Sequence, residues 1–159
     1  KLGNTAELAT KASSLVTEIK SKDKQIEQLS AEIASINAKS ALENAKDING
    51  IKLITAIVSD TAPNDLRTIC DSAKQNGDNI VVIVAGTQPK KGSVNFACAC
   101  GKDAVAKGAH AGNIVREVAK IANGSGGGKP DSAMAGAKDM SKTQDAIKSA
   151  ESIVASMIK

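Results

Sequence analysis

Two compact, mostly apolar runs, "IKLITAIV" at residues 51–58 and "NIVVIVAGT" at residues 79–87, constrain the fold of this chain most strongly. Short runs of this kind, rich in Val and Ile, are typical of strands buried on both faces. Between them, Pro63 suits the first turn of a helix that ends near residues 75–78. The buried side of that helix would carry Leu66, Ile69, Cys70 and Ala73. A strand–helix–strand order predicts an α/β layer structure.

Further elements follow along the chain. Residues 93–101, "SVNFACACG", predict a third strand that forms a hairpin with the second through the turn at residues 88–92. Helical patterns then cover residues 103–106, 112–123 and 141–158. We therefore expect an α/β fold with a small mixed sheet packed by helices. The glycine-rich residues 124–139 are expected to form a loop between the last two helices.

The N-terminal part has a different periodicity. Residues 4–38 form one long helical pattern whose apolar positions recur every 3.5 residues, interrupted by Lys22. Such a stripe is buried either against a second copy in a coiled coil or against a helix that precedes this chain. The candidate dimerisation residues are Leu15, Ile19, Ile26, Leu29, Ile33 and Ile36. A short helix over residues 40–46 would complete a helical, coiled-coil arm at 1–46, followed by a globular α/β domain at 47–159.

Composition limits the possible functions. The 159 residues carry a net charge of +4, which suits an acidic partner such as nucleic acid, and Phe96 is the only aromatic residue. An RNA-binding surface built on stacked aromatic side chains is therefore nearly excluded. The sequence has no apolar run long enough for a membrane span and no export signal, so we expect a cytoplasmic protein. Because the chain starts at Lys1 within a helical pattern, we expect it to be part of a longer protein.

The glycine-rich stretch "GSGGGKPDSAMAGAKD", residues 124–139, allows two interpretations. Consecutive exposed glycine amides can form an anion-binding nest, with Lys129, Ser132 and Lys138 adding charge and hydrogen-bond donors. Alternatively, the glycines allow two backbones to cross closely without any ligand. The stretch is not a Walker A motif, because Pro130 follows Lys129 where that motif needs Ser or Thr.

The order of these letters resembles the glycine-rich signature of the DHHA1 domain, which ends alanyl-tRNA synthetases and occurs in DHH-family phosphoesterases. "INGIKLI" at residues 48–54 is similar to the entry to the domain's first strand, and residues 106–128 are similar to the helix leading into its glycine loop. Before about residue 40 the resemblance consists only of the heptad pattern, which is similar to the helix that precedes this domain in the synthetases.

The resemblance to the synthetase C-terminal region implies a module that binds the elbow of tRNA(Ala), links aminoacylation with editing, and helps dimer formation. It implies no catalytic residues in this chain, while ATP, Mg²⁺ and Zn²⁺ would belong to the parent ligase. The alternative is the substrate-binding half of a DHH-family phosphoesterase acting on oligonucleotides or cyclic dinucleotides. The candidate tRNA-binding residues are Gly126, Gly127, Gly128, Lys129, Ser132, Lys138, His110, Lys107 and Arg116, with Lys90 and Lys91 as further candidates for phosphate contact.

Two other residue types allow competing interpretations. His110 either contacts the RNA, by donating to a phosphate or by stacking on a base or ribose, or fills a gap at a helix start. Cys70, Cys98, Cys100 and His110 formally make up a zinc-ligand set. Cys98 and Cys100, however, share one side of an apolar strand, so we expect buried thiols and no metal site. Asp139 is expected to cap a helix or hold the glycine segment in shape.

We expect the substitutions Ile26→Lys and Ile33→Lys together to convert a dimer of this chain into a monomer. Both residues occupy seam positions of the heptad pattern, where a charged side chain opposes coiled-coil pairing. Sedimentation of the chain with and without residues 1–40 measures the effect. A full chain that stays monomeric at high concentration would contradict the coiled-coil interpretation.

Overall fold

The computed structural model describes residues 11, 14–15, 17–22 and 45–158. The chain divides into two units, residues 1–37 and 38–159, and each is described by itself. In the first unit the described residues are helical, and Leu15 and Ile19 are exposed to 57% and 58%. The other four candidate dimerisation residues, Ile26, Leu29, Ile33 and Ile36, lie outside the described residues, as does most of the predicted helix at 40–46.

The second unit contains a six-stranded mixed sheet with the order β1-β2-β3-β4-β6-β5. Only β2 and β3 run parallel, and every other neighbouring pair is antiparallel. The strands are β1 (Lys46–Ile48), β2 (Ile51–Ser59), β3 (Ile80–Gln88), β4 (Ser93–Cys100), β5 (Gly124–Gly128) and β6 (Ser132–Ala137). The predicted α/β class, the three predicted strands and the β3–β4 hairpin are confirmed.

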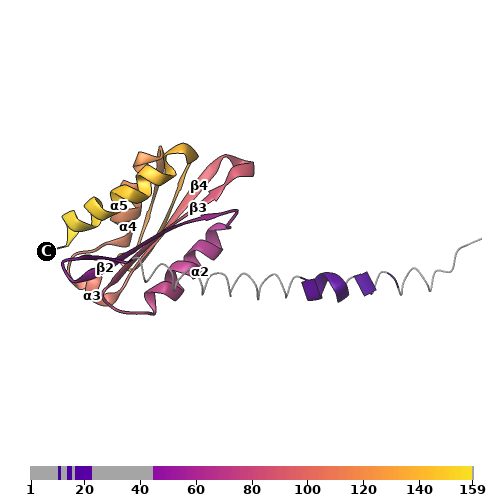
Figure 1. Ribbon diagram of the computed structural model, residues 1–159, viewed down its shortest axis with the longest axis horizontal. Helices are drawn as coiled ribbons and strands as arrows, with labels where there is room; N and C mark the ends of the chain where they lie inside the picture. The colour runs from indigo at the N-terminus through magenta and orange to yellow at the C-terminus, as the bar shows by residue number, and fades with distance from the viewer. Residues whose placement is uncertain (1–10, 12–13, 16, 23–44, 159) are drawn as a thin grey trace, which may run out of the picture. The chain divides into compact units, whose positions relative to one another are not determined.

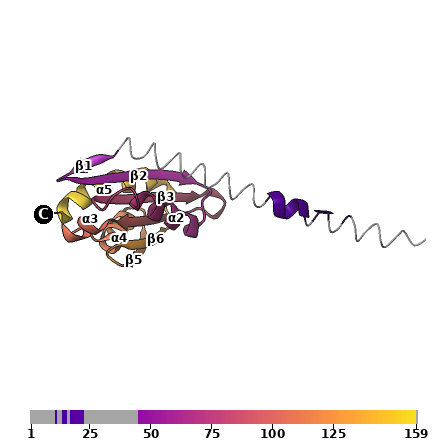
Figure 2. The ribbon, with the colours of Figure 1, turned by 90° about the horizontal axis from the view of Figure 1, so that it is seen from below.

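Helices cover both faces of this sheet (Figure 1). The helix α2 lies on one face and forms the crossover between the parallel strands β2 and β3, whereas α4 and α5 lie on the other face. The helices are α2 (Pro63–Lys74), α3 (Lys102–Ala106), α4 (Ala111–Ile121) and α5 (Thr143–Met157), with 3₁₀ turns η1 (Pro89–Lys91) and η2 (Met140–Lys142). Figure 2 shows β5 and β6 at the sheet edge opposite β1.

The N-terminal strand β1 was not predicted, and the predicted helix is wrong at Lys46, where β1 begins. A two-residue turn, Asn49–Gly50, joins β1 to β2, because Ile48 pairs directly with Ile51. Both turn residues have positive φ, 52° and 78°. An Asn-Gly pair between apolar residues is the strongest local signal for such a hairpin, so this strand could have been found from "DING" at residues 47–50.

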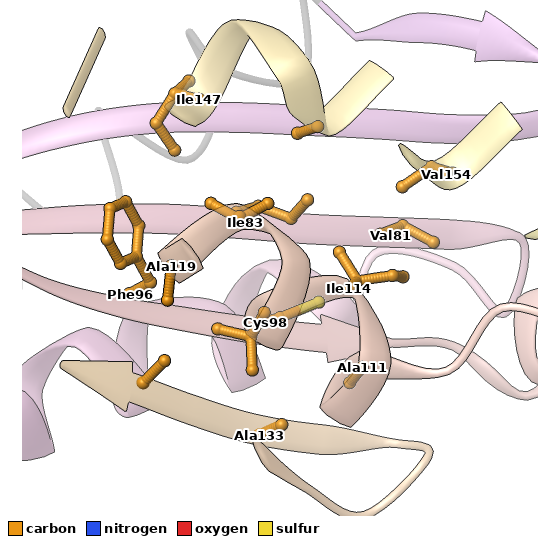
Figure 3. Packing of buried hydrophobic residues seen from close by; sticks show 14 of the residues in the cluster. Val81, Ile83, Phe96, Cys98, Ala111, Ile114, Ala119, Ala133, Ile147 and Val154 are labelled. Carbon is orange, nitrogen blue, oxygen red and sulfur yellow. The ribbon is translucent and has the colours of Figure 1, made fainter. Parts of the chain in front are cut away.

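The core has two parts, one on each face of the sheet. Towards α4 and α5, Phe96, Val81 and Ile83 pack with Ile114 of α4 and Val154 of α5 (Figure 3). Towards α2, the buried residues are Ile54, Leu66, Cys70, Ala73, Ile80, Val82, Val84, Ala97 and Ala99. The strand β3 contributes to both parts, which explains why its sequence is an unbroken apolar run.

One glycine of β3 sets how closely α2 approaches the sheet. A Cβ atom built on Gly86 would lie 2.6 Å from Cδ1 of the fully buried Leu66. We expect Gly86→Ala to lower the free energy of unfolding by about 1–3 kcal/mol through overpacking. Urea denaturation measures this, with Gly136→Ala as the control, because a Cβ on Gly136 meets only an ordinary contact at 3.6 Å.

Coupling between the two residues tests the cause. If the added methyl acts through Leu66, the loss in the double variant Gly86→Ala, Leu66→Val is smaller than the sum of the two single losses. Additive losses would show that Gly86 serves another purpose.

Candidate nucleic-acid interface

The glycine-rich segment is a β-hairpin, so the predicted loop at residues 124–139 is wrong. β5 pairs with β6 in antiparallel register from Gly124 opposite Ala137 to Gly128 opposite Ala133. The N–H of Lys129 donates to the carbonyl of Ser132 at 3.0 Å and closes the turn. On β6, Ala133, Ala135 and Ala137 alternate with more exposed residues and face the core. This alternation in "SAMAGA" is the signal that the prediction missed.

Close packing requires three of the four glycines of β5, namely Gly124, Gly126 and Gly128. A Cβ atom on Gly126 would lie 2.3 Å from Cα of Ala135, and one on Gly124 would lie 2.4 Å from Cβ of Ala137. On the helix side, a Cβ on Gly112 of α4 would lie 2.4 Å from the carbonyl oxygen of Gly128. The close crossing of two backbones that one interpretation of this segment predicts is therefore present at these glycines.

The start of α4 is satisfied by the same hairpin. The N–H groups of Ala111 and Gly112 donate to the carbonyls of Pro130 and Lys129, at 2.9 and 3.2 Å. His110 is the N-cap, and its Nδ1 accepts from the N–H of Asn113 at 3.3 Å. These contacts use the N–H groups that a helix start can otherwise offer to an anion. In this structure the His110 side chain therefore caps the N-terminus of α4.

The predicted basic residues are distributed over the domain. Lys107 donates to the carbonyl of Asn49 at 3.0 Å, at the β1–β2 turn. Arg116 of α4 donates through Nε to the carbonyl of Gly126 at 3.4 Å. Lys129 and Ser132 lie at the β5–β6 turn, whereas Lys138 follows β6 at its opposite end. The structure thus brings together His110, Arg116, Gly126, Gly127, Gly128, Lys129 and Ser132, but neither Lys107 nor Lys138.

Asp139 connects the hairpin to the C-terminal helix, as predicted. Its Oδ1 accepts from the N–H of Ser141 at 3.1 Å and caps η2. Its Oδ2 accepts from the side-chain amide of Asn123, which precedes β5, at 3.3 Å. The hydrogen bond from the Ser141 hydroxyl, followed by the charge of Lys142 and main-chain N–H groups, lowers the pKa of the Asp139 carboxyl below its ordinary value.

A comparison with protein-family models matches residues 50–156 of this chain to the DHHA1 domain. The chain belongs to the DHHA1 domain family. The match covers β2 to α5, so it includes the glycine-rich hairpin and the helix α4 packed on it. The family predicted from the sequence resemblance is therefore confirmed.

Curated relatives of this DHHA1 domain are alanine–tRNA ligases. The chain is 39% identical over 145 residues to that of Alkaliphilus oremlandii and 41% identical over 151 residues to that of Carboxydothermus hydrogenoformans. These alignments cover 91% and 95% of this chain. The chain itself spans 16–17% of the length of these relatives.

Solved structures show the same fold. The C-Ala domain from Aquifex aeolicus alanyl-tRNA synthetase matches with a TM-score of 0.64 at 28% identity, covering 70% of this chain and 97% of that one. A DHH-domain protein, described as belonging to a family of ribosomal proteins, matches with a TM-score of 0.52 at 16% identity. That match covers 81% of this chain and 32% of the other chain and shows the fold alone.

The three cysteines of the DHHA1 domain are buried thiols, as predicted. Cys98 and Cys100 face the α4–α5 side of the sheet, whereas Cys70 of α2 lies in the opposite part of the core. Burial raises the pKa of Cys70 to about 12, and hydrogen bonding with Cys100 together with burial raises the pKa of Cys98 well above its ordinary value. These two thiols therefore stay protonated at neutral pH, which opposes metal binding and nucleophilic chemistry.

Two of the cavities formed by the described residues are lined by neither the glycines of β5 nor other residues of that strand. One of about 500 Å³ lies between α4 and α5, over Ile121, Ile153 and Met157. The other, of about 480 Å³, lies at the C-terminal end of β4, where Lys74 pairs with Asp131 at 3.9 Å. In the described part of the chain, no three His, Cys, Asp or Glu side chains gather as metal ligands, and no helix is long and apolar enough to span a membrane.

We expect Asp139→Asn to lower the melting temperature at neutral pH, because the amide cannot provide the charge that the η2 N–H groups and Lys142 stabilise. The pKa of the carboxyl is lower in the folded state, so its contribution is complete above the unfolded value of about 4 and is lost as pH falls through the folded value. The difference in melting temperature between the parent chain and the variant should therefore shrink in acid.

Circular dichroism melts between neutral pH and about pH 3 measure this difference. Ser141→Ala, which removes the main cause of the lowered pKa, should reduce the acid-dependent part and serves as the matched variant. A difference that stays constant across this range would contradict the assignment to the Asp139 charge.

Proposed function

We propose that this chain is the C-terminal tRNA-binding region of an alanine–tRNA ligase and that it holds the elbow of tRNA(Ala). The observation that carries the proposal is the identity of 39–41% to ligases over more than nine-tenths of this chain. The fold of the C-Ala domain, matched along 97% of its length, supports the same assignment.

The chemistry of the domain suits RNA recognition by shape. The net charge is +4, and the single aromatic residue, Phe96, is fully buried in the core. Base stacking on Phe, Tyr or Trp is thus excluded, which leaves His110, lysine, arginine, main-chain and small polar groups as contacts. Such contacts recognise phosphates and ribose rather than base sequence, as expected for a module that holds a tRNA corner.

The role in the whole ligase follows from this proposal. Bound to the elbow, the domain links the aminoacylation and editing parts, which would hold ATP, Mg²⁺ and Zn²⁺ outside this chain. Self-association would use the heptad pattern of residues 1–40, and the protein would work in the cytoplasm, where tRNA is charged. The DHH phosphoesterase alternative has only fold-level support, at 16% identity, and we do not propose it.

We expect the 159-residue chain to bind an alanine tRNA transcript weakly, with an affinity that falls steeply as salt rises. Each phosphate neutralised by Lys or Arg adds about 0.7–0.9 to the slope of log affinity against log salt. Gel-shift titrations at several salt concentrations measure this slope, and a tRNA variant with a disrupted elbow locates the contact. Equal affinity at low and high salt would contradict the mechanism, and equal affinity for both transcripts would contradict the elbow.

A further inference from the structure

Gly136 in the middle of β6 is a glycine that the fold itself does not require. Its φ lies outside the left-handed region, and a Cβ atom built on it would meet only Oδ1 of Asn95, at 3.6 Å. The residue is exposed and pairs with Asn95 of β4 on one side and Ser125 of β5 on the other. A glycine inside a strand costs stability and often marks a place where a ligand or another backbone approaches closely.

Three other glycines of this hairpin, all on β5, differ from Gly136 because packing against β6 requires them. Cβ atoms on Gly124, Gly126 and Gly128 would lie 2.3–2.7 Å from atoms of β6, so packing explains these residues. Packing does not explain Gly136. The missing side chain leaves bare main chain on the sheet surface, at a position where the Cβ atom of an alanine would fit and glycine lowers the stability of the strand.

The surroundings of Gly136 are small and polar. Asn95, Ser93 and Ser125 are half-buried or exposed, and among the described residues none of their side chains has a hydrogen-bond partner. They share the face of the sheet on which α2 packs, since Ala97 and Ala99 of the same strand as Asn95 are buried beneath α2. The open area therefore lies beside α2, with free hydroxyl and amide groups around bare main chain.

Three lysines without ion pairs lie where β4 begins and β6 ends, beside Gly136, Asn95 and Ser93. Lys90 and Lys91 form η1 between β3 and β4, and Lys138 directly follows β6, where Ala137 pairs with Val94. Within the described residues, none of these three lysines has an acidic partner. By contrast, carboxylates or carbonyls engage other lysines of the domain, namely Lys46, Lys74, Lys107 and Lys120. Lys52, Lys102, Lys129 and Lys148 of the described domain also have no acidic partner, but Lys90, Lys91 and Lys138 are the ones that lie at the end of β4 and β6 beside this area.

We propose that the sugar–phosphate backbone of the bound RNA lies across Gly136, in contact with Ser93, Asn95 and Ser125, while Lys91 and Lys138 bind its phosphates. We call these six residues the Gly136 strip. Hydroxyl and amide side chains contact phosphate and ribose oxygens, and bare main chain lets the backbone approach. This inference rests on the proposed tRNA-binding function. It locates the contact surface away from the β5–β6 turn, where the N–H groups at the start of α4 already have partners.

The first test is Gly136→Val. Because the Cβ atom meets only an ordinary contact at this position and valine favours a strand, the melting temperature should equal or exceed that of the parent chain. The affinity for an alanine tRNA transcript should fall roughly tenfold, the equivalent of one lost hydrogen bond to a charged group. Thr55→Val, at an exposed position of β2, is the matched control and should leave RNA affinity unchanged.

The second test is charge removal in the 159-residue chain. Lys91→Gln and Lys138→Gln should each weaken binding and each reduce the salt slope by about 1, as expected for a lost phosphate contact. Lys52→Gln, at an exposed lysine of β2 outside the candidate tRNA-binding set, should change neither quantity, whereas Lys129→Gln reports on the competing contact at the β5–β6 turn.

The outcomes separate the two proposals. If the parent chain does not bind tRNA at all, the proposed function fails. If it binds and Gly136→Val binds equally well, or if Lys129→Gln lowers the slope while Lys138→Gln does not, the function stands and the Gly136 strip is overturned. Loss of affinity in Gly136→Val together with an unchanged melting temperature supports the strip, since a folding defect would lower both.

Discussion

The close contact between α4 and the β5–β6 hairpin is the constraint on which the C-terminal half of the domain depends. The carbonyls of Lys129 and Pro130 accept the first N–H groups of α4, and Gly112 faces the carbonyl of Gly128 at a distance that no side chain permits. The strand β5, whose glycines have poor β-propensity, is thereby stabilised by packing against β6 and α4. Because the alanines of β6 join the same core as Ile114, the contact also fixes the edge of the sheet.

The central layer could be predicted from the sequence because its signals are local. The apolar runs of β2 and β3, the alternation in β4 and the apolar faces of α2, α4 and α5 all depend on residues close in the chain. The strand β5 could not be predicted in this way. "GSGGG" has loop composition, and only tertiary packing against β6 and α4 makes it a strand. The strands β1 and β6 had usable signals, the Asn-Gly turn and the alternating alanines, but both are short.

The candidate site shows the same limit. Individual roles were visible from the sequence, including capping by Asp139 and the burial of all three cysteines. Which lysines share a surface was not, because that depends on strand order. Lys129 and Lys138 are close in the sequence, but β6 separates them, whereas Lys91 and Lys138 come together through the pairing of β4 with β6. The prediction therefore placed Lys129 and Lys138 in one site because they are close in the sequence, although they lie at opposite ends of β6.

Glycine has two distinct functions in this hairpin, and the distinction bears on how a domain without surface aromatic residues can recognise RNA. On β5 the glycines remove side chains from an internal contact, so that replacing them would damage the fold. On β6, Gly136 removes a side chain from the surface, where the fold would accept one. Without Phe, Tyr or Trp on the surface for bases to stack on, close approach of main chain to ribose and phosphate is one way to gain contact area. The cost in strand stability at Gly136 is then understandable as a requirement of binding.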